Sequence, residues 1–77
     1  MTVNPGIYQH YKGDFYVVLG VAKHTEKDSF FVVYHKRPSQ YPPELHARPL
    51  KMFTENVAYE GKVVPRFKHL TLEGLAK

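Results

Sequence analysis

The feature that most constrains the fold is a pair of apolar segments joined by a short polar stretch. The first segment runs from Phe15 to about His24, and the second runs from Ser29 to His35. Both are rich in valine, tyrosine and phenylalanine, which suit a pleated strand. Residues 24–28 between them are polar. The sequence therefore predicts a long antiparallel β-hairpin around which shorter strands are arranged.

The first strand of this hairpin carries a glycine, Gly20, near its middle. Glycine within a strand usually marks a bulge or a sharp bend. The two alternating sets of residues, starting at Phe15 and at Tyr16, are both mostly apolar. We therefore expect this strand to be covered on both sides for much of its length. A long strand bent at a glycine is one way to close a small barrel.

The rest of the chain predicts shorter elements. We expect further strands at residues 6–10, 45–48, 54–59 and 62–69, a helical turn at 49–53, and turns at 11–14 and 60–61. Pro65 cannot donate to a strand ladder, which predicts an edge position or a bulge in the last strand. The prolines in residues 36–44 exclude a helix there and indicate a long loop.

Together these elements predict an all-β fold with one short helical turn. We expect a small, strongly bent antiparallel SH3-like barrel of five to six strands. A chain of 77 residues is long enough for one domain with a thin core. We place this domain at residues 6–70, between a disordered N-terminal end at 1–5 and a C-terminal tail at 71–77 that docks weakly or frays.

The composition limits the compartment and the chemistry. The chain has no cysteine, which excludes disulfides and thiolate metal sites and favours a reducing environment. The first residues show no signal-peptide pattern. The longest apolar run, Phe15–Ala22, is far shorter than the roughly 20 residues that cross a membrane. We therefore expect a cytoplasmic protein without a membrane partner.

Several segments carry a family resemblance through their order and spacing. They are Gly6–Gly13, Tyr16–Glu26, Val32–Tyr34, Arg48–Phe53 and Val64–Phe67. Together they resemble the DUF1653 domain, a bacterial family of unknown function. The resemblance covers Gly6 to about Phe67 and implies a small β-barrel domain, but it implies no activity. The loop before Arg48 departs from the family pattern because it is rich in proline and ends in His46-Ala47, so a ligand recognised by that loop can differ here.

Polar residues within these matching segments form the first candidate site. They are His10, Lys12, His24, Thr25, Glu26 and Arg48. Arg48 offers a guanidinium for phosphate or carboxylate, Glu26 a carboxylate, and His24 an imidazole that titrates near neutral pH. The structural alternative, which we favour, is that Arg48 pairs with Glu26 and that Thr25 caps a turn.

Tyrosines and basic residues form a second candidate surface. A groove lined by rings such as Tyr34 and edged by Lys12, Lys36 and Arg37 could stack bases or hold a proline-rich peptide. The alternative is that each tyrosine packs its ring and hydrates its hydroxyl. A net charge of +4 favours polyanions in a general way, although lysines of this number also serve as an ordinary solvated surface.

Catalysis and metal binding find little support. The five histidines show no metal-ligand spacing. The two serines, Ser29 and Ser39, lack a nucleophile-elbow context, and no glycine-rich loop is present to cradle phosphate. We expect no catalytic residue, no metal and no cofactor.

We therefore expect a monomeric binding module without enzymatic activity, and its charge favours nucleic acid, RNA or DNA, as the partner. One alternative is a small anionic-ligand site around Arg48, Glu26 and His24. The other is an accessory domain that binds a protein or peptide. A steep loss of affinity with added salt distinguishes nucleic acid from peptide.

Overall fold

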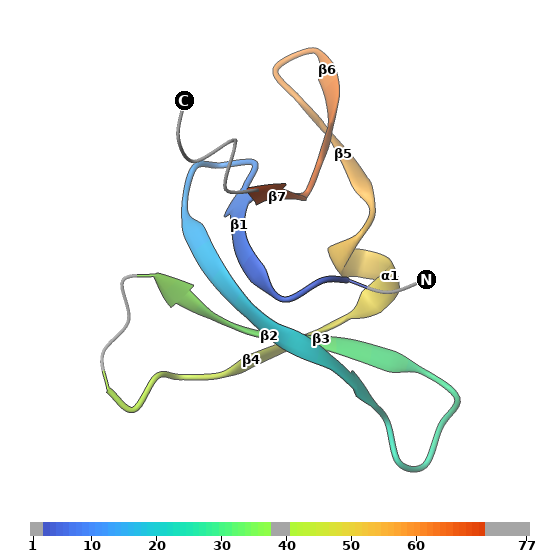
Figure 1. The fold of residues 1–77 in the computed structure, drawn as a ribbon. Coiled ribbons are helices and arrows are strands. Elements are labelled where there is room, and N and C mark those ends of the chain that lie inside the picture. Colours follow the sequence, from blue (N-terminus) through green and yellow to red (C-terminus); the bar gives the residue numbers. More distant parts are fainter. Residues whose placement is uncertain (1–2, 38–40, 71–77) are drawn as a thin grey trace.

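The computed structural model describes residues 3–37 and 41–70, which form seven strands and one helical turn (Figure 1). The elements are β1 (Gly6–His10), β2 (Phe15–Lys23), β3 (Phe30–Arg37), β4 (His46–Pro49), α1 (Leu50–Phe53), β5 (Asn56–Tyr59), β6 (Lys62–Pro65) and β7 (Phe67–Leu70). The predicted tail at 71–77, part of the predicted N-terminal end and part of the proline-rich loop lie outside the described residues.

The strands form two antiparallel sheets. The larger has the order β4-β3-β2-β1-β7, and the smaller is the hairpin β5-β6. The predicted all-β class with one short helical turn is confirmed. The larger sheet is open, with β4 and β7 at its edges, so it does not close into the barrel that we expected. No helix among the described residues is long and apolar enough to cross a membrane.

The last predicted strand, 62–69, is divided in two. The chain bends at Arg66, so that β6 pairs with β5 while β7 pairs with β1. Pro65, just before the bend, has no N–H to continue a ladder. The Arg66 N–H donates to the Glu55 carbonyl at 3.0 Å, and the Arg66 carbonyl accepts from the Tyr11 N–H at 3.0 Å. These bonds fix the bend between the two sheets.

The β5–β6 hairpin turns at Glu60 and Gly61, where the sequence predicts a turn. Both residues have positive φ angles, 51° at Glu60 and 76° at Gly61. Positive angles at both central positions define the tight turn whose twist matches that of paired strands. Gly61 adopts this conformation without steric cost, since it has no Cβ. The hairpin that this turn closes extends away from the larger sheet (Figure 1).

The predicted central hairpin is confirmed, and it contains a bulge. Strand β2 pairs with β3 from Phe15↔Arg37 to Lys23↔Phe30, and the register shifts between Val18 and Gly20. The extra residue at Leu19 shifts the alternation by one position. Val18 is therefore buried before the bulge, while Val21 packs against the core after it.

The core lies on one face of the larger sheet. Its buried residues are Tyr8, Val18, Val32, Tyr34, Phe53 and Phe67. The expectation that β2 is covered on both sides is wrong, since Leu19 is 50% exposed and Phe15 is 40% exposed. The bulge turns Leu19 outward, and the helical turn α1 packs on the opposite face, where the core lies.

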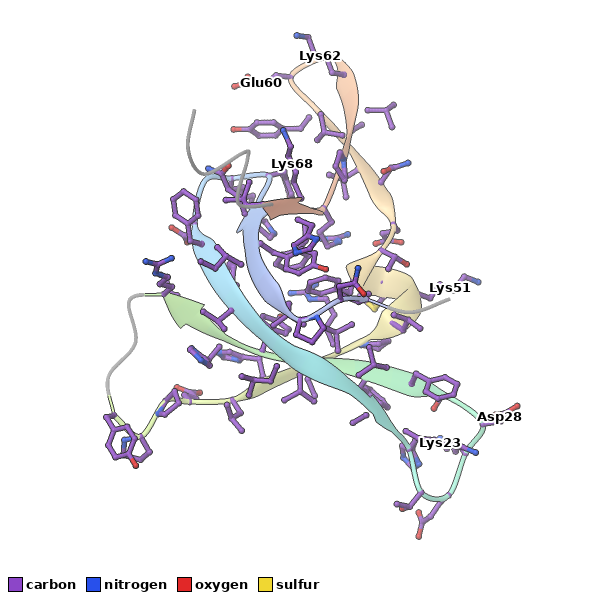
Figure 2. The ribbon with its side chains drawn as sticks, in the orientation of Figure 1. Lys23, Asp28, Lys51, Glu60, Lys62 and Lys68 are labelled. Atoms are coloured by element: carbon purple, nitrogen blue, oxygen red, sulfur yellow. The ribbon has the colours of Figure 1, made fainter. Side chains whose placement is uncertain are left out.

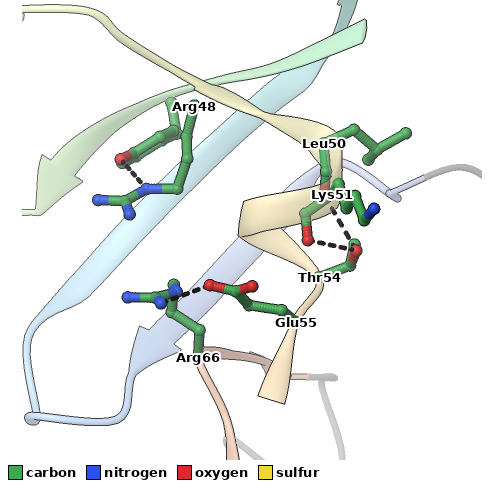
Figure 3. Close-up of polar contacts among 7 residues, drawn as sticks. Arg48, Leu50, Lys51, Thr54, Glu55 and Arg66 are labelled. Atoms are coloured by element: carbon green, nitrogen blue, oxygen red, sulfur yellow. Dashed lines mark hydrogen bonds and ion pairs between the residues drawn. The ribbon is translucent and has the colours of Figure 1, made fainter. Parts of the chain in front are cut away.

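The helical turn α1 holds this core together although it is only four residues long. Phe53 is 2% exposed, and its ring stacks on Phe67 with the centroids 4.1 Å apart. The same ring meets the edge of Tyr8 at 5.5 Å. At the end of the turn, the Thr54 hydroxyl donates to the Leu50 carbonyl at 2.9 Å (Figure 3). A helix this short is stable only through its packing.

We expect Phe53→Ala to lower the free energy of unfolding by about 3–5 kcal/mol, because it leaves a cavity at the centre of the core. That loss is most of the stability of a domain this small, which is on the order of 5 kcal/mol. Urea denaturation followed by circular dichroism measures the change, and Phe53→Leu provides a milder variant. Met52→Ala is the matched control on the same turn, since Met52 is 44% exposed. Equal losses for Phe53→Ala and Met52→Ala would contradict the role given to Phe53.

Candidate functional site

Arg48 lies on the core face of the sheet beside aromatic rings. It pairs in register with Val32, so its side chain shares the face of the buried residues. Its Nε donates to the Tyr34 hydroxyl at 3.2 Å (Figure 3), and its guanidinium lies 5.6 Å from the centre of the Phe67 ring. The salt bridges of the described residues, Lys36–Asp14 and Arg66–Glu55, do not include it. The predicted ion pair between Arg48 and Glu26 is therefore not formed.

Arg66 is a second arginine directed toward the same region. Figure 3 shows the guanidinium groups of Arg48 and Arg66 pointing to the same side. One terminal nitrogen of Arg66 bonds to Glu55 Oε1 at 2.6 Å. Its Nε is buried without a hydrogen-bond partner in the described part of the chain. Sequence reasoning missed Arg66, although it lies in the matching segment Val64–Phe67, because its role depends on the bend that follows Pro65.

His10 lies against aromatic rings of the core and within reach of the charges of both arginines. Its ring centroid is 5.0 Å from that of Phe67 and 4.4 Å from that of Tyr11. Burial lowers the pKa of His10 below its usual value of 6.5, and the positive charges of Arg48, Arg66 and Lys12 lower it further, against a smaller opposing effect of Asp14. His10 is thus a largely neutral imidazole at neutral pH. We call His10, Tyr34, Arg48 and Arg66 the arginine cluster.

The structure does not bring His24, Thr25 and Glu26 to Arg48. These residues form the turn at the far end of the β2–β3 hairpin, the end marked by Lys23 and Asp28 in Figure 2. Arg48 pairs with Val32, and Val32 pairs with Val21 on the next strand. Along that strand, His24 lies about 10 Å beyond Val21. The hairpin extends beyond β4, and this separates the predicted partners.

His24 organises its own turn. Its Nδ1 accepts the backbone N–H of Glu26 at 3.0 Å and that of Lys27 at 3.2 Å. Side chains that bond to nearby backbone groups in this way stabilise turns. In the described residues, no three histidine or acidic side chains lie close enough together to hold a metal ion.

The predicted basic residues do gather at one end of the sheet. Lys36 and Arg37 pair with Tyr16 and Phe15 at the start of β2, next to the turn that carries Lys12. Lys36 Nζ lies 3.6 Å from the Asp14 carboxylate of that turn. Tyr34, which we expected to line a groove, is 5% exposed and belongs to the core. Its hydroxyl supports Arg48, so its ring is not free to stack on a ligand.

A pocket opens at the same end, between β1, β7 and the β5–β6 hairpin. Its volume is about 440 Å³, and it is lined by Gln9, His10, Tyr11, Tyr59, Val64, Pro65 and Lys68. Tyr11 and Tyr59 meet edge to face, with centroids 5.1 Å apart, and Lys12 Nζ lies 5.8 Å from the Tyr11 ring centre. Sequence reasoning did not find this pocket, because it depends on where the hairpin packs. We call it the tyrosine pocket.

Comparison with known proteins places the chain in a family. The model for proteins of unknown function DUF1653 matches residues 6–69. The chain is a DUF1653 protein. A crystal structure of a DUF1653 protein from Bordetella bronchiseptica is similar to it, with 36% sequence identity, a TM-score of 0.75, and coverage of 90% of this chain and 92% of that chain. A comparison with curated proteins gave no match. The family resemblance is thus confirmed. Membership of this family indicates the fold but assigns no activity.

We expect Arg48→Gln to raise the pKa of His10 toward 6.5, because the substitution removes a positive charge that disfavours the imidazolium. An NMR titration of the His10 ring protons measures this pKa. Arg37→Gln is the control, because it removes the same charge at an exposed position. If Arg48→Gln leaves the His10 pKa unchanged, or Arg37→Gln raises it as much, then the proximity of Arg48 to His10 is contradicted.

Proposed function

We propose that this DUF1653 protein is a non-enzymatic binding module for single-stranded nucleic acid, RNA or DNA. The observation that carries the proposal is the tyrosine pocket with basic residues around it. Proteins that bind single strands combine aromatic side chains, on which bases stack, with cationic groups that follow the phosphates. Both features lie at one end of this molecule.

The pocket suits a planar ring. Its volume of about 440 Å³ is within the range of small-ligand sites. Tyr59 is 38% exposed and stands on a hairpin outside the core, so its ring is available for contact. Pro65 and Val64 add apolar walls, while Gln9 supplies a hydrogen-bonding amide. A base stacked on tyrosine needs no particular sequence, since every base has an aromatic face.

The charge around the pocket favours an anionic strand. Lys68 lines it, Lys12 lies over the Tyr11 ring, and Lys36 and Arg37 lie at the adjoining end of β3. The nearby carboxylate of Asp14 is engaged by Lys36. The positive charge at this end therefore exceeds the negative charge, and contact with phosphates would release counterions.

A binding role fits this site better than catalysis. The His10 ring lies against tyrosine and phenylalanine rings, and its Nδ1 accepts the Lys12 backbone N–H at 3.2 Å. No carboxylate bonds to this ring within the described part of the chain. A single histidine without a nucleophile or an orienting carboxylate is a poor catalytic set. The absence of cysteine supports a reducing, cytoplasmic setting for the module.

We expect Tyr59→Ala to weaken binding of a fluorescent mixed-sequence single-stranded oligonucleotide by roughly 5- to 150-fold, as for the loss of one stacked base. Tyr59→Phe should retain most of the affinity. Lys68→Gln should lower the slope of log affinity against log salt by about one. Fluorescence anisotropy at several salt concentrations measures both effects.

Lys23→Gln is the matched control for Lys68→Gln, because Lys23 lies at the opposite end of the molecule (Figure 2). It should leave both affinity and salt slope unchanged. Absence of oligonucleotide binding at low salt would overturn the proposal. Binding that salt does not weaken would favour a peptide in the same apolar pocket.

A further inference from the structure

We infer that Arg48 and Arg66, together with His10, form a second recognition site, for the phosphate monoester class of anion. The juxtaposition that carries this inference is two partly buried arginines whose guanidinium groups point to the same side (Figure 3), one over the Phe67 ring and the other held by Glu55. The inference goes beyond nucleic-acid binding at the tyrosine pocket, since His10 lines that pocket but the two arginines do not.

The charge of Arg48 is held only by neutral groups. Its Nε bonds to the Tyr34 hydroxyl at 3.2 Å, and its guanidinium lies over the Phe67 ring. The arginine side chain has five N–H donors, and no other hydrogen bond engages those of Arg48 in the described residues. Partial burial of a charge without a counter-ion is unfavourable. A bound anion would accept hydrogen bonds from the remaining N–H groups of Arg48 and balance its charge.

Arg66 offers a second, oriented set of donors. Glu55 holds one of its terminal nitrogens at 2.6 Å, which fixes the plane of the guanidinium. The side chain of Arg66 is 21% exposed, and its buried Nε has no partner within the described part of the chain. Glu55 thus balances the charge of Arg66, while the charge of Arg48 has no acid partner among the described residues and is left for a ligand.

Two cationic or protonatable groups contact the Phe67 ring, and a third belongs to the residue before it. Arg48 lies over its ring, His10 meets the ring at 5.0 Å, and Arg66 immediately precedes it in the chain. His10 senses both arginines, since their charges act on its titration. An anion between them would reverse this effect. Anion binding should therefore be accompanied by proton uptake at His10, a signature that a purely structural arginine would not give.

The chemistry of the donors favours a monoester over related anions. A phosphate monoester carries up to two charges and three free oxygens, which two planar guanidiniums and an imidazolium can contact together. A carboxylate offers only two oxygens. A phosphodiester within a strand carries one charge, and its two ester linkages would have to pass through a partly buried cluster.

The first experiment titrates the intact protein with inorganic phosphate and follows the side-chain Nε–H signals of Arg48 and Arg66 by NMR. Chloride at matched ionic strength is the reference. We expect saturable shifts of both signals and a rise in the His10 pKa as phosphate binds. Arg48→Lys keeps the charge but loses the planar donor fork, and it should weaken binding roughly tenfold or more. Lys23→Gln, at the far end of the β2–β3 hairpin, should have no effect.

The second experiment distinguishes the source of the phosphate. It compares a single-stranded oligonucleotide bearing a 5′-phosphate with the same strand bearing a 5′-hydroxyl. Tighter binding of the phosphorylated strand, lost in Arg48→Lys, would identify a strand end as the ligand. Equal binding of the two strands, together with saturable binding of inorganic phosphate, would identify a small phosphorylated molecule.

The inference is overturned if phosphate causes no more change than chloride and the 5′-phosphate adds no affinity. Arg66→Lys is the second variant, in case the substitution at Arg48 disturbs the core, and circular dichroism checks the fold of each. The 5′-hydroxyl strand alone tests binding at the tyrosine pocket. Failure of one proposal is therefore separable from failure of the other.

Discussion

The Phe67 ring is the contact on which both the core and the arginine cluster depend. Phe53 stacks on it with the centroids 4.1 Å apart, and this stack attaches the helical turn to the sheet. Arg48 lies over the same ring, and His10 meets it. Phe67 occupies this position only because the chain bends at Arg66 and directs β7 back to β1. The bend that divides the last predicted strand between two sheets thus also assembles the candidate anion site.

The bulge at Leu19 determines which residues this core contains. Without it, Val18 and Val21 would face opposite sides of the sheet, because strand side chains alternate. With it, both reach the side occupied by Val32 and Tyr34. Tyr34 then presents its hydroxyl to Arg48. One extra residue in β2 is therefore coupled, through Tyr34, to the placement of a charged group two strands away.

Sequence reasoning recovers the features that depend on local residue preference. The central hairpin, the role of Gly20 as a sign of a bulge, the helical turn ending at Phe53 and the turn at Gly61 all follow from short-range patterns. The division of the last predicted strand does not, since it depends on whether the chain after Pro65 continues β6 or bends. The sequence shows only that Pro65 interrupts a ladder, and both outcomes satisfy that constraint.

The site is less predictable than the fold, for a related reason. Glu26 and Arg48 are complementary in charge, but their separation is determined by how far the β2–β3 hairpin extends past β4. Arg66 and Tyr59 belong to segments whose positions depend on the bend and on the packing of the small hairpin. The sequence correctly groups Lys12 with Lys36 and Arg37, because the register of the β2–β3 hairpin alone places them at the same end of the sheet.

The partners of Asp14 and Glu55 show how the molecule keeps its positive charge. Asp14 engages Lys36 at the surface, while Glu55 engages Arg66 at the edge of the core. A carboxylate placed at Arg48 instead would neutralise the charge that faces the ring of Phe67. Glu55 orients one arginine and leaves the other without an acid partner among the described residues. A purely structural ion-pair network would more simply pair each arginine with an acid, so this uneven distribution favours an external anion.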